Sequence, residues 1–305
     1  MFKKTFVAAF ALVVLAGCGG NSKSESLPNT VKFPVSMSTQ HSGQVRIDKE
    51  PTSVISLSPT ATEALFAVGA GDQVVAVDKL SNYPENAPKS DIDAFSPNIE
   101  AILAKKPDLV VLSDDMNNIV ASLKKAKVPV LIEPAAKTLD DAYFQILEIG
   151  IATGHDGDAN TLVNKMKKDV LDIQATLATG GKKTKAYIEI DDTYYSATSK
   201  TLIGSLLQQA SGTNIADKAP NAESGYPQLS AEYVVKANPQ VIFLTDTKTY
   251  GVTADSVKKR PGFSSVSAVK NNHIVVIDDD IAQRWGPRTT ELFKQIVDGI
   301  NAANK

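Results

Sequence analysis

Two arginines near the C-terminus, Arg284 and Arg288, stand on either side of the run Trp285-Gly-Pro. A guanidinium group offers a planar fork of donors, so two of them close together could hold a carboxylate, a phosphate or the anionic rim of a metal complex. An ion pair between Arg288 and Glu291, or another nearby carboxylate, would instead fix the last helix. We therefore predict a ligand role for Arg284 and a structural role for Arg288.

Aromatic residues are scarce, at 6% of the chain, yet several fall in short polar loops. A flat aromatic face beside polar groups is what a bulky, partly planar ligand requires. Packing at the edge of a domain explains any one of these rings equally well. Tyr195 and Trp285 have strongly polar neighbours and are the better candidates for ligand contact. The rings are those of Tyr83, Phe95, Tyr194, Tyr195, Tyr226, Tyr250 and Trp285.

Residue types that could hold a metal ion or perform catalysis are few and scattered. The histidines are His41, His155 and His273, and Cys18 is the only cysteine, so we expect no site for a free metal ion. No Gly-x-Ser-x-Gly motif is present, and aspartate runs such as Asp278 to Asp280 are more often solvated turns than acid/base pairs. A net charge of -2 argues against nucleic acid as a partner. The sequence predicts neither an enzyme nor a resident cofactor.

The loops that carry these residues need a scaffold, and its central piece is the segment from Asp156 to Thr179. Its apolar residues recur every three or four positions while lysines and aspartates fill most of the remainder, which predicts one amphipathic helix. Gly180-Gly181 would end that helix. At about 1.5 Å of rise per residue it would be about 35 Å long, enough to cross a small domain.

The chain before this helix and the chain after it follow the same pattern. Glu100 to Leu112 and Glu232 to Leu244 both place a glutamate, a proline and a final leucine at the same spacing. This spacing indicates a short helix stopped by proline and followed by a strand. That succession is common in α/β proteins, but the flanks of both copies also agree in their strands, loops and helices. We predict an α/β fold with two Rossmann-like lobes joined by one long α-helix.

The N-terminus has the pattern of an export signal. Two lysines precede an apolar run too short to cross a bilayer, and the run ends in Leu15-Ala-Gly-Cys18, which resembles the signal of bacterial lipoproteins. Cleavage before Cys18 and lipidation of its sulfur would tether the protein outside the cytoplasm. Gly19 to Asn29 is small and polar and is expected to be a flexible leash, followed by a hairpin within Val31 to Ile47.

These features divide the chain into five predicted parts. No internal disulfide is possible, so each lobe must be held by an apolar core, which 305 residues at 43% hydrophobic composition can supply. The parts are residues 1–17 (signal peptide), 18–50 (lipidated cysteine, leash and hairpin), 51–155 (N-terminal lobe), 156–181 (linking helix) and 182–305 (C-terminal lobe).

Several sequence stretches from both lobes are informative when they are taken together. They are SLSPTATEALFAVGAGDQVVAV, NIEAILAKKPDLVVL and GYPQLSAEYVVKANPQVIFL, with Ser81-Asn-Tyr-Pro84, Arg260-Pro-Gly-Phe263, Ala268-Val-Lys270 and Gly286-Pro-Arg288. Together they resemble the iron-siderophore and vitamin B12 family of solute-binding lipoproteins of ABC importers, from about residue 33 to the end. The resemblance implies a metal-chelate ligand held in a cleft between two lobes. It also implies a monomer outside the cytoplasm, attached to the membrane only through its lipid, with an ABC permease dimer as partner.

Ligands of open α/β sheets bind beyond the carboxyl ends of the strands, so the loops that leave those ends are predicted to line the cleft. In the first lobe these loops are Ser58 to Thr62, Lys79 to Tyr83, Asp93 to Pro97 and Ser113 to Asn118. In the second they are Asp191 to Lys200, Ala222 to Tyr226, Thr245 to Tyr250 and Asp280 to Arg288. The residues predicted to bind the ligand are Ser58, Thr60, Lys79, Tyr83, Phe95, Asp114, Tyr195, Tyr226, Arg284 and Trp285.

Glu100 and Glu232 form a separate pair, one in each copy of the repeat. A carboxylate in the first turn of a helix is favoured by the helix dipole, which would explain each of them by itself. The resemblance implies a second role, because in the family one surface glutamate on each lobe docks to arginines of a two-fold symmetric permease. We expect Glu100 and Glu232 to be these two anchors.

A ferric siderophore is the ligand that the sequence favours, with a corrinoid second. The predicted cleft loops mix aromatic rings with Arg and Lys and lack a cluster of metal ligands. Leu80 and the Ser113-Asp114 pair stand where the B12 binder has rings that hold the corrin, while Phe95 keeps a third ring. The scattered histidines give haem little support. The alternatives are a cobalamin-specific binder, then a surface lipoprotein without a transport role or an enzyme on the same fold.

Overall fold

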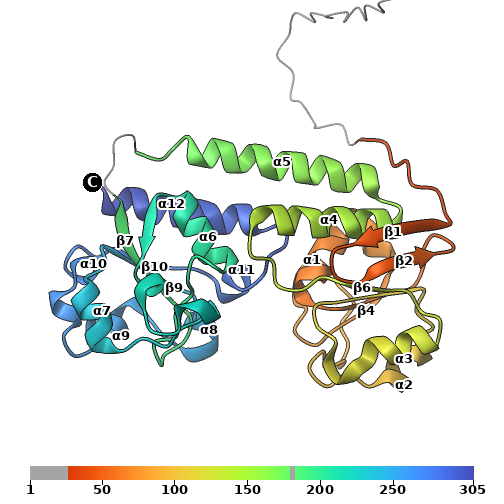
Figure 1. The fold of residues 1–305 in the computed structure, drawn as a ribbon, viewed down its shortest axis with the longest axis horizontal. Helices are drawn as coiled ribbons and strands as arrows, with labels where there is room; N and C mark the ends of the chain where they lie inside the picture. Colours follow the sequence, from red (N-terminus) through yellow and green to blue (C-terminus); the bar gives the residue numbers. More distant parts are fainter. Residues whose placement is uncertain (1–26, 179–182) are drawn as a thin grey trace, which may run out of the picture.

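The computed structural model describes residues 27–178 and 183–305 and contains two α/β lobes with one long helix across them (Figure 1). Each lobe has a four-stranded sheet whose strands all run parallel. The N-terminal sheet has the order β4 (Val74–Val77), β3 (Val54–Leu57), β5 (Leu109–Leu112) and β6 (Val130–Ile132). The C-terminal sheet has the order β8 (Gly212–Asn214), β7 (Thr184–Glu189), β9 (Val241–Leu244) and β10 (Ile274–Val276). Both lobes thus share one strand order, and the predicted fold class is confirmed.

Helices cover both faces of the two sheets, which is why the central strands are apolar along their whole length. Every residue of β3, β5 and β9 is buried. The N-terminal helices are α1 (Pro59–Ala67), α2 (Ile99–Ala104), α3 (Ile119–Lys125) and α4 (Leu139–Thr153). The C-terminal helices are α6 (Leu202–Gln209), α7 (Ala231–Ala237), α8 (Thr247–Tyr250), α9 (Ala254–Lys258), α10 (Ser267–Lys270), α11 (Asp279–Ala282) and α12 (Thr289–Ala303).

The long helix α5 (Asp156–Gln174) lies along one side of the molecule and packs against α4 and α12 (Figure 1). Its predicted apolar face is buried, with Ala159, Val163 and Met166 at 3% exposure or less. These side chains belong to one apolar core that also contains residues of both sheets. The two lobes are therefore joined by a shared core as well as by the chain.

The end of α5 differs from the prediction, which carried the helix to Gly180-Gly181. The helix stops at Gln174, and its 19 residues span about 28 Å. Asn301 of α12 donates to the carbonyl of Thr176 at 3.0 Å and accepts from the amide of Ala178 at 3.1 Å. Because these bonds use backbone groups that a further helical turn would need, the chain leaves the helix there. The two glycines lie outside the described residues.

A hairpin precedes the first lobe, as the sequence predicts. Its strands are β1 (Val35–Thr39) and β2 (Gly43–Ile47), paired antiparallel with Val35 opposite Ile47. The hairpin buries Met37, Val45 and Ile47 in the shared core. It is therefore part of the N-terminal lobe. In the described part of the chain, no helix combines the length and the apolar character that crossing a membrane requires.

The segment Leu27–Val31, which we call the strap, is bound to the first turns of α5. The leash predicted over Gly19 to Asn29 is wrong for Leu27 to Asn29, because these residues make specific contacts. The amide of Leu27 donates to Thr161 Oγ1 at 2.8 Å, and Asn29 Oδ1 accepts from the amide of Gly157 at 2.8 Å. Asn29 thus caps a helix whose own N-terminal residue supplies no side-chain cap. Cys18 and the rest of the leash lie outside the described residues.

Candidate functional site

A cavity of about 270 Å³ lies between the lobes at the carboxyl ends of the strands. Ile190 and Thr245, which directly follow β7 and β9, form part of its wall in the C-terminal lobe. Ala135 and Ala136, from the loop after β6, close it from the N-terminal lobe. The cavity therefore occupies the position where ligands of open α/β sheets bind.

A second cavity of about 550 Å³ continues the first and shares Ala135, Ala136, Thr201 and Tyr226 with it. Charged side chains border this part, with Lys137 from one lobe and Lys200 and Glu223 from the other. Together the two cavities form an interlobe cleft with an apolar inner end and a charged outer end. A bulky ligand with a flat body and polar substituents would fit such a cleft.

The ring of Trp285 lines the inner end of the cleft, but its nitrogen is not accessible from the cavity. The side chain lines the first cavity, and its Nε1 is buried with no partner among the described residues. A buried N–H without an acceptor costs about 1–3 kcal/mol. Trp285 therefore offers a ligand in the cavity an apolar ring surface and not a hydrogen-bond donor.

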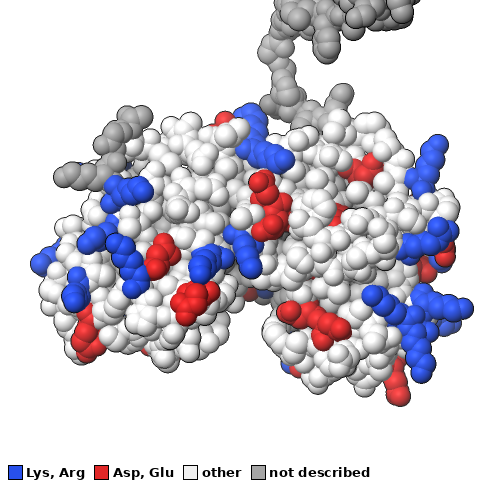
Figure 2. All heavy atoms as spheres, viewed as in Figure 1, with Lys and Arg blue, Asp and Glu red and all other residues white. Residues whose placement is uncertain are grey.

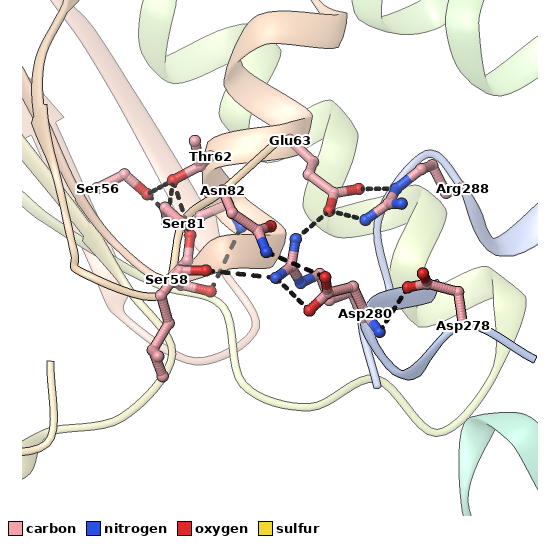
Figure 3. Close-up of polar contacts among 12 residues, drawn as sticks. Ser56, Ser58, Thr62, Glu63, Ser81, Asn82, Asp278, Asp280 and Arg288 are labelled. Carbon is pink, nitrogen blue, oxygen red and sulfur yellow. Dashed lines mark hydrogen bonds and ion pairs between the residues drawn. The ribbon is translucent and has the colours of Figure 1, made fainter. Parts of the chain in front are cut away.

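The lobes are also joined beside the cleft by the interlobe ion cluster, which we define as Glu63, Asp280, Arg284 and Arg288 (Figure 3). Glu63 lies on α1, and its side chain is only 1% exposed. Its Oε1 accepts from Arg284 Nη1 at 2.8 Å, and its Oε2 accepts from Arg288 Nε at 2.8 Å. One carboxylate of the N-terminal lobe is thus held by two guanidinium groups of the C-terminal lobe.

Asp280 extends this cluster towards solvent. It accepts from Arg284 at 2.7 Å, from Asn82 of the other lobe at 3.0 Å and from Lys248 at 3.2 Å. Burial acts to raise the pKa of Asp280, but the Asn82 hydrogen bond and the charges of Arg284 and Lys248 outweigh burial and lower that pKa. Asp280 therefore stays ionised and connects the interlobe ion cluster to Asn82 in the N-terminal lobe and to Lys248 in the C-terminal lobe.

Arg284 and Arg288 thus belong to one network of ion pairs. Arg288 has the structural role expected of it, although its partner is Glu63 across the cleft instead of a carboxylate on its own helix. Its guanidinium also lies over the ring of Tyr83, 4.4 Å from the centroid. Arg284 borders the first cavity while it binds Glu63 and Asp280. Its contact with a ligand stays a prediction.

The other residues predicted in the N-terminal lobe do not line the two cavities. Phe95 and Asp114 share a separate small cavity of about 60 Å³. Ser58 is buried as the cap of α1, where its side chain accepts from the amide of Ala61. Thr60 is also buried, and Lys79 pairs with Asp93 at 2.7 Å. These residues lie near the carboxyl ends of the strands, as predicted, but they do not come together in one site.

In the C-terminal lobe, Tyr226 borders both cavities, and Tyr195 lies outside them. Partial burial raises the pKa of the Tyr226 hydroxyl, although the residue as a whole is 50% exposed. Several rings of the strand-exit loops remain exposed, at 39% to 64%. These rings are Tyr83, Phe95, Tyr195, Tyr226 and Tyr250.

The loop from Pro134 to Thr138 is the part of the cleft that sequence reasoning missed. Four of its residues line one or both cavities. The strand before it was predicted, so the rule that ligand loops follow strands could have found it. Its small apolar residues gave no chemical signal of their own.

Two neighbouring buried carboxyl groups, those of Glu133 and Glu148, lie where this loop begins. Glu133 follows β6, is 2% exposed, and neither of its oxygens has a hydrogen-bond partner among the described residues. Burial, together with the neighbouring Glu148, raises the pKa of Glu133 to about 10. Glu148 is 3% exposed and accepts from the amide of Gln40, in the turn of the hairpin. At neutral pH the Glu133 carboxyl is therefore protonated.

Glu100 and Glu232 occupy equivalent places on the two lobes. Each is the second residue of its helix, α2 or α7, and each helix leads into the third strand of its sheet. The caps are Asn98 and Ser230, two residues earlier in both cases. Both glutamates are exposed. Backbone and Ser230 hydrogen bonds lower the pKa of Glu232, so its carboxylate is charged at neutral pH.

Comparison with known proteins identifies the family. The chain matches the periplasmic binding protein family over residues 54–281, which includes the sheets of both lobes. The chain belongs to this family. YvrC of Bacillus subtilis, described as an uncharacterised ABC transporter substrate-binding lipoprotein, is 33% identical over 302 residues, or 95% of this chain and 94% of its own. The resemblance found in the sequence is confirmed.

Two further members of the periplasmic binding protein family have descriptions that name a ligand. A cobalamin-binding protein of Halobacterium salinarum is 28% identical over 294 residues, which are 90% of this chain and 79% of its own. A crystal structure from Staphylococcus epidermidis, described as a possible iron-binding, periplasmic solute-binding protein, has a TM-score of 0.72 and 30% identity. It covers 83% of this chain and 99% of its own. All of these relatives are described as binding proteins.

Proposed function

We propose that this protein binds a metal chelate of the ferric siderophore or corrinoid type outside the cytoplasm and delivers it to an ABC importer. The interlobe cleft carries this proposal, because the ring of Trp285 lines its apolar inner end and its outer end carries a lysine from each lobe together with Glu223. The iron-binding and cobalamin-binding relatives support the same ligand class. The protein would act as a monomeric carrier without catalysis, held to the membrane through lipid on Cys18.

A ferric siderophore is the first choice of ligand, because Lys137 and Lys200 outnumber Glu223 at the outer end and so favour an anionic chelate. Cobalamin is the second, and the cobalamin-binding relative favours it. Titration of the protein lacking residues 1–18 with ferric hydroxamates, ferric catecholates, cobalamin and haem decides between them. Tyrosine and Trp285 fluorescence report saturation. Binding of cobalamin alone would reverse the order, and binding of none of the four would refute the proposal.

The ring of Trp285 gives a sharper prediction. Trp285→Ala removes this ring from the cavity wall, so affinity for the saturating chelate should fall about tenfold, as expected for the loss of one aromatic contact. Isothermal titration measures this without relying on tryptophan fluorescence. Phe144→Leu serves as control, because Phe144 is an exposed apolar residue on α4 and lines neither cavity. Equal affinities for Trp285→Ala and the parent protein would show that Trp285 does not contact the ligand.

Docking of the two lobes to a permease predicts that Glu100 and Glu232 affect transport but not chelate binding. The variant with both changed to alanine should bind the chelate normally but transport it at least about tenfold more slowly, because each ion pair buried on docking is worth about 2–5 kcal/mol. Uptake of radiolabelled chelate by cells measures the loss. Glu85→Ala, another exposed glutamate, is the control. Normal uptake by the double variant would rule out these anchors.

A further inference from the structure

The strap is held to α5 by more contacts than a passive tether needs. Thr30 and Val31 donate their amides to Asp156 Oδ1 at 2.9 and 3.0 Å, and the Thr30 hydroxyl donates to Asp156 Oδ2 at 2.6 Å. Asn29 binds Asp158 at 3.0 Å through its side-chain nitrogen. With the bonds of Leu27 and Asn29 described above, the strap is fixed along its length.

Gly157 allows this close approach. A Cβ at that position would lie 2.1 Å from the carbonyl oxygen of Leu27 and 2.5 Å from the carbonyl carbon of Pro28. Both contacts are with backbone atoms, so a side chain there would push the strap away. Gly157 lies in the first turn of α5 and its φ is not in the left-handed region, so alanine would suit the helix itself.

The strap and the two docking glutamates lie on opposite sides of the molecule. Side chains of α5 pack into the shared core, whereas α2 and α7 contribute to the separate cores on the other faces of the two sheets. Figure 1 shows α5 along one side and α2 and α7 at the other, with both sheets between them. A tether that leaves at α5 therefore starts from the side opposite Glu100 and Glu232.

The chain between Cys18 and the strap is short, which limits how the anchored protein can be oriented. Nine residue steps separate Cys18 from Leu27, so the leash reaches at most about 32 Å. A lobe of this size has a radius of gyration of about 14 Å, and the path over its surface from one side to the other is about 55 Å. Release of the strap as far as Lys32 would extend the reach to about 50 Å. The released form thus covers about nine tenths of that path, whereas the strapped form covers less than about two thirds of it.

We infer that the strap is a release switch: while it is bound to α5, the lipid anchor holds the α2 and α7 side away from the membrane, and docking requires the strap to leave. This inference rests on the proposed lipid anchor and docking face. It predicts that the docking-competent form is a minor population of the anchored protein. Apparent affinity for the permease is then reduced by the fraction that is strapped.

Two changes to the full anchored chain test the switch. Gly157→Ala should speed hydrogen exchange of the Thr30 and Val31 amides and raise uptake of radiolabelled ferric hydroxamate and cobalamin about tenfold, by enlarging the released population. Insertion of a flexible Gly/Ser segment of about sixteen residues after Ser22 should give the same gain, because docking no longer needs release. Gly157→Ala should add nothing to the inserted form. Asn164→Ala, on α5 but beyond the strap, is the control and should change neither readout.

The outcomes separate this inference from the function on which it rests. Unchanged exchange of Thr30 and Val31 in Gly157→Ala would refute the close contact. Unchanged uptake in both Gly157→Ala and the inserted form, with uptake still dependent on Glu100 and Glu232, would refute the switch alone. Loss of all dependence on the two glutamates would refute the docking face instead.

Discussion

Glu63→Ala is expected to lower the free energy of unfolding by about 3–5 kcal/mol, the cost of removing one partner of a buried ion pair. Arg284 would remain 8% exposed in its side chain with one of its two carboxylates missing, and Arg288 would lose its only carboxylate partner in the described structure. Urea unfolding followed by circular dichroism measures the change. The loss should be larger than for any other single exposed or half-buried carboxylate.

Glu291→Ala is the matched control for this experiment. Glu291 is an exposed glutamate in the first turn of α12, three residues after Arg288, and no ion pair of the described residues involves it. Its replacement should cost no more than about 0.5 kcal/mol. A loss below about 1 kcal/mol for Glu63→Ala would mean that the interlobe ion cluster adds little to the packing of the shared core.

Glu133→Gln should have its largest effect at alkaline pH. The pKa of Glu133 rises from about 4.5 in the unfolded chain to about 10 in the fold because of burial and Glu148. The stability linked to this proton is complete below about pH 4.5 and is lost as the pH rises towards about 10. Between about pH 5.5 and pH 8.5 the native protein should lose about 4 kcal/mol that the glutamine variant keeps, at about 1.4 kcal/mol per unit.

The comparison needs unfolding curves of both proteins at several pH values, because other groups titrate in the same range. Only the difference between the two curves belongs to Glu133. Glu85→Gln, an exposed substitution of the same type, should run parallel to the native protein. Parallel curves for Glu133→Gln would show that the carboxyl pair is solvated and ionised, contrary to its burial. Glu148 stays in place throughout and can accept a hydrogen bond from the new amide.

The fold could be predicted because its signals are local. Apolar runs such as those of β5 and β9, each preceded by a helix and a proline, mark buried parallel strands in both halves of the chain. The buried face of α5 follows from its spacing. Its end at Gln174 could not be predicted, because the contact that sets it comes from Asn301, 125 residues away from Thr176. The same holds for the strap, whose partners on α5 lie about as far along the chain.

The site was predicted less completely, since strand ends indicate where a ligand binds but not which side chains point into the gap. Tyr226, Arg284 and Trp285 line the cleft as predicted. Ser58 instead serves its helix as a cap, a use that its position before Pro59 could also have indicated. Glu63 carried no signal at all, because its two arginines are more than 200 residues distant.

That separation has a consequence for the order of folding. Synthesis from the N-terminus delivers Glu63 and every strand of the first sheet long before Arg284 and Arg288. The first half can therefore fold while Glu63 still lacks both guanidinium partners, and only the last residues of the chain complete the interlobe ion cluster. A chain truncated before Arg284 would leave Glu63 without either of these cations.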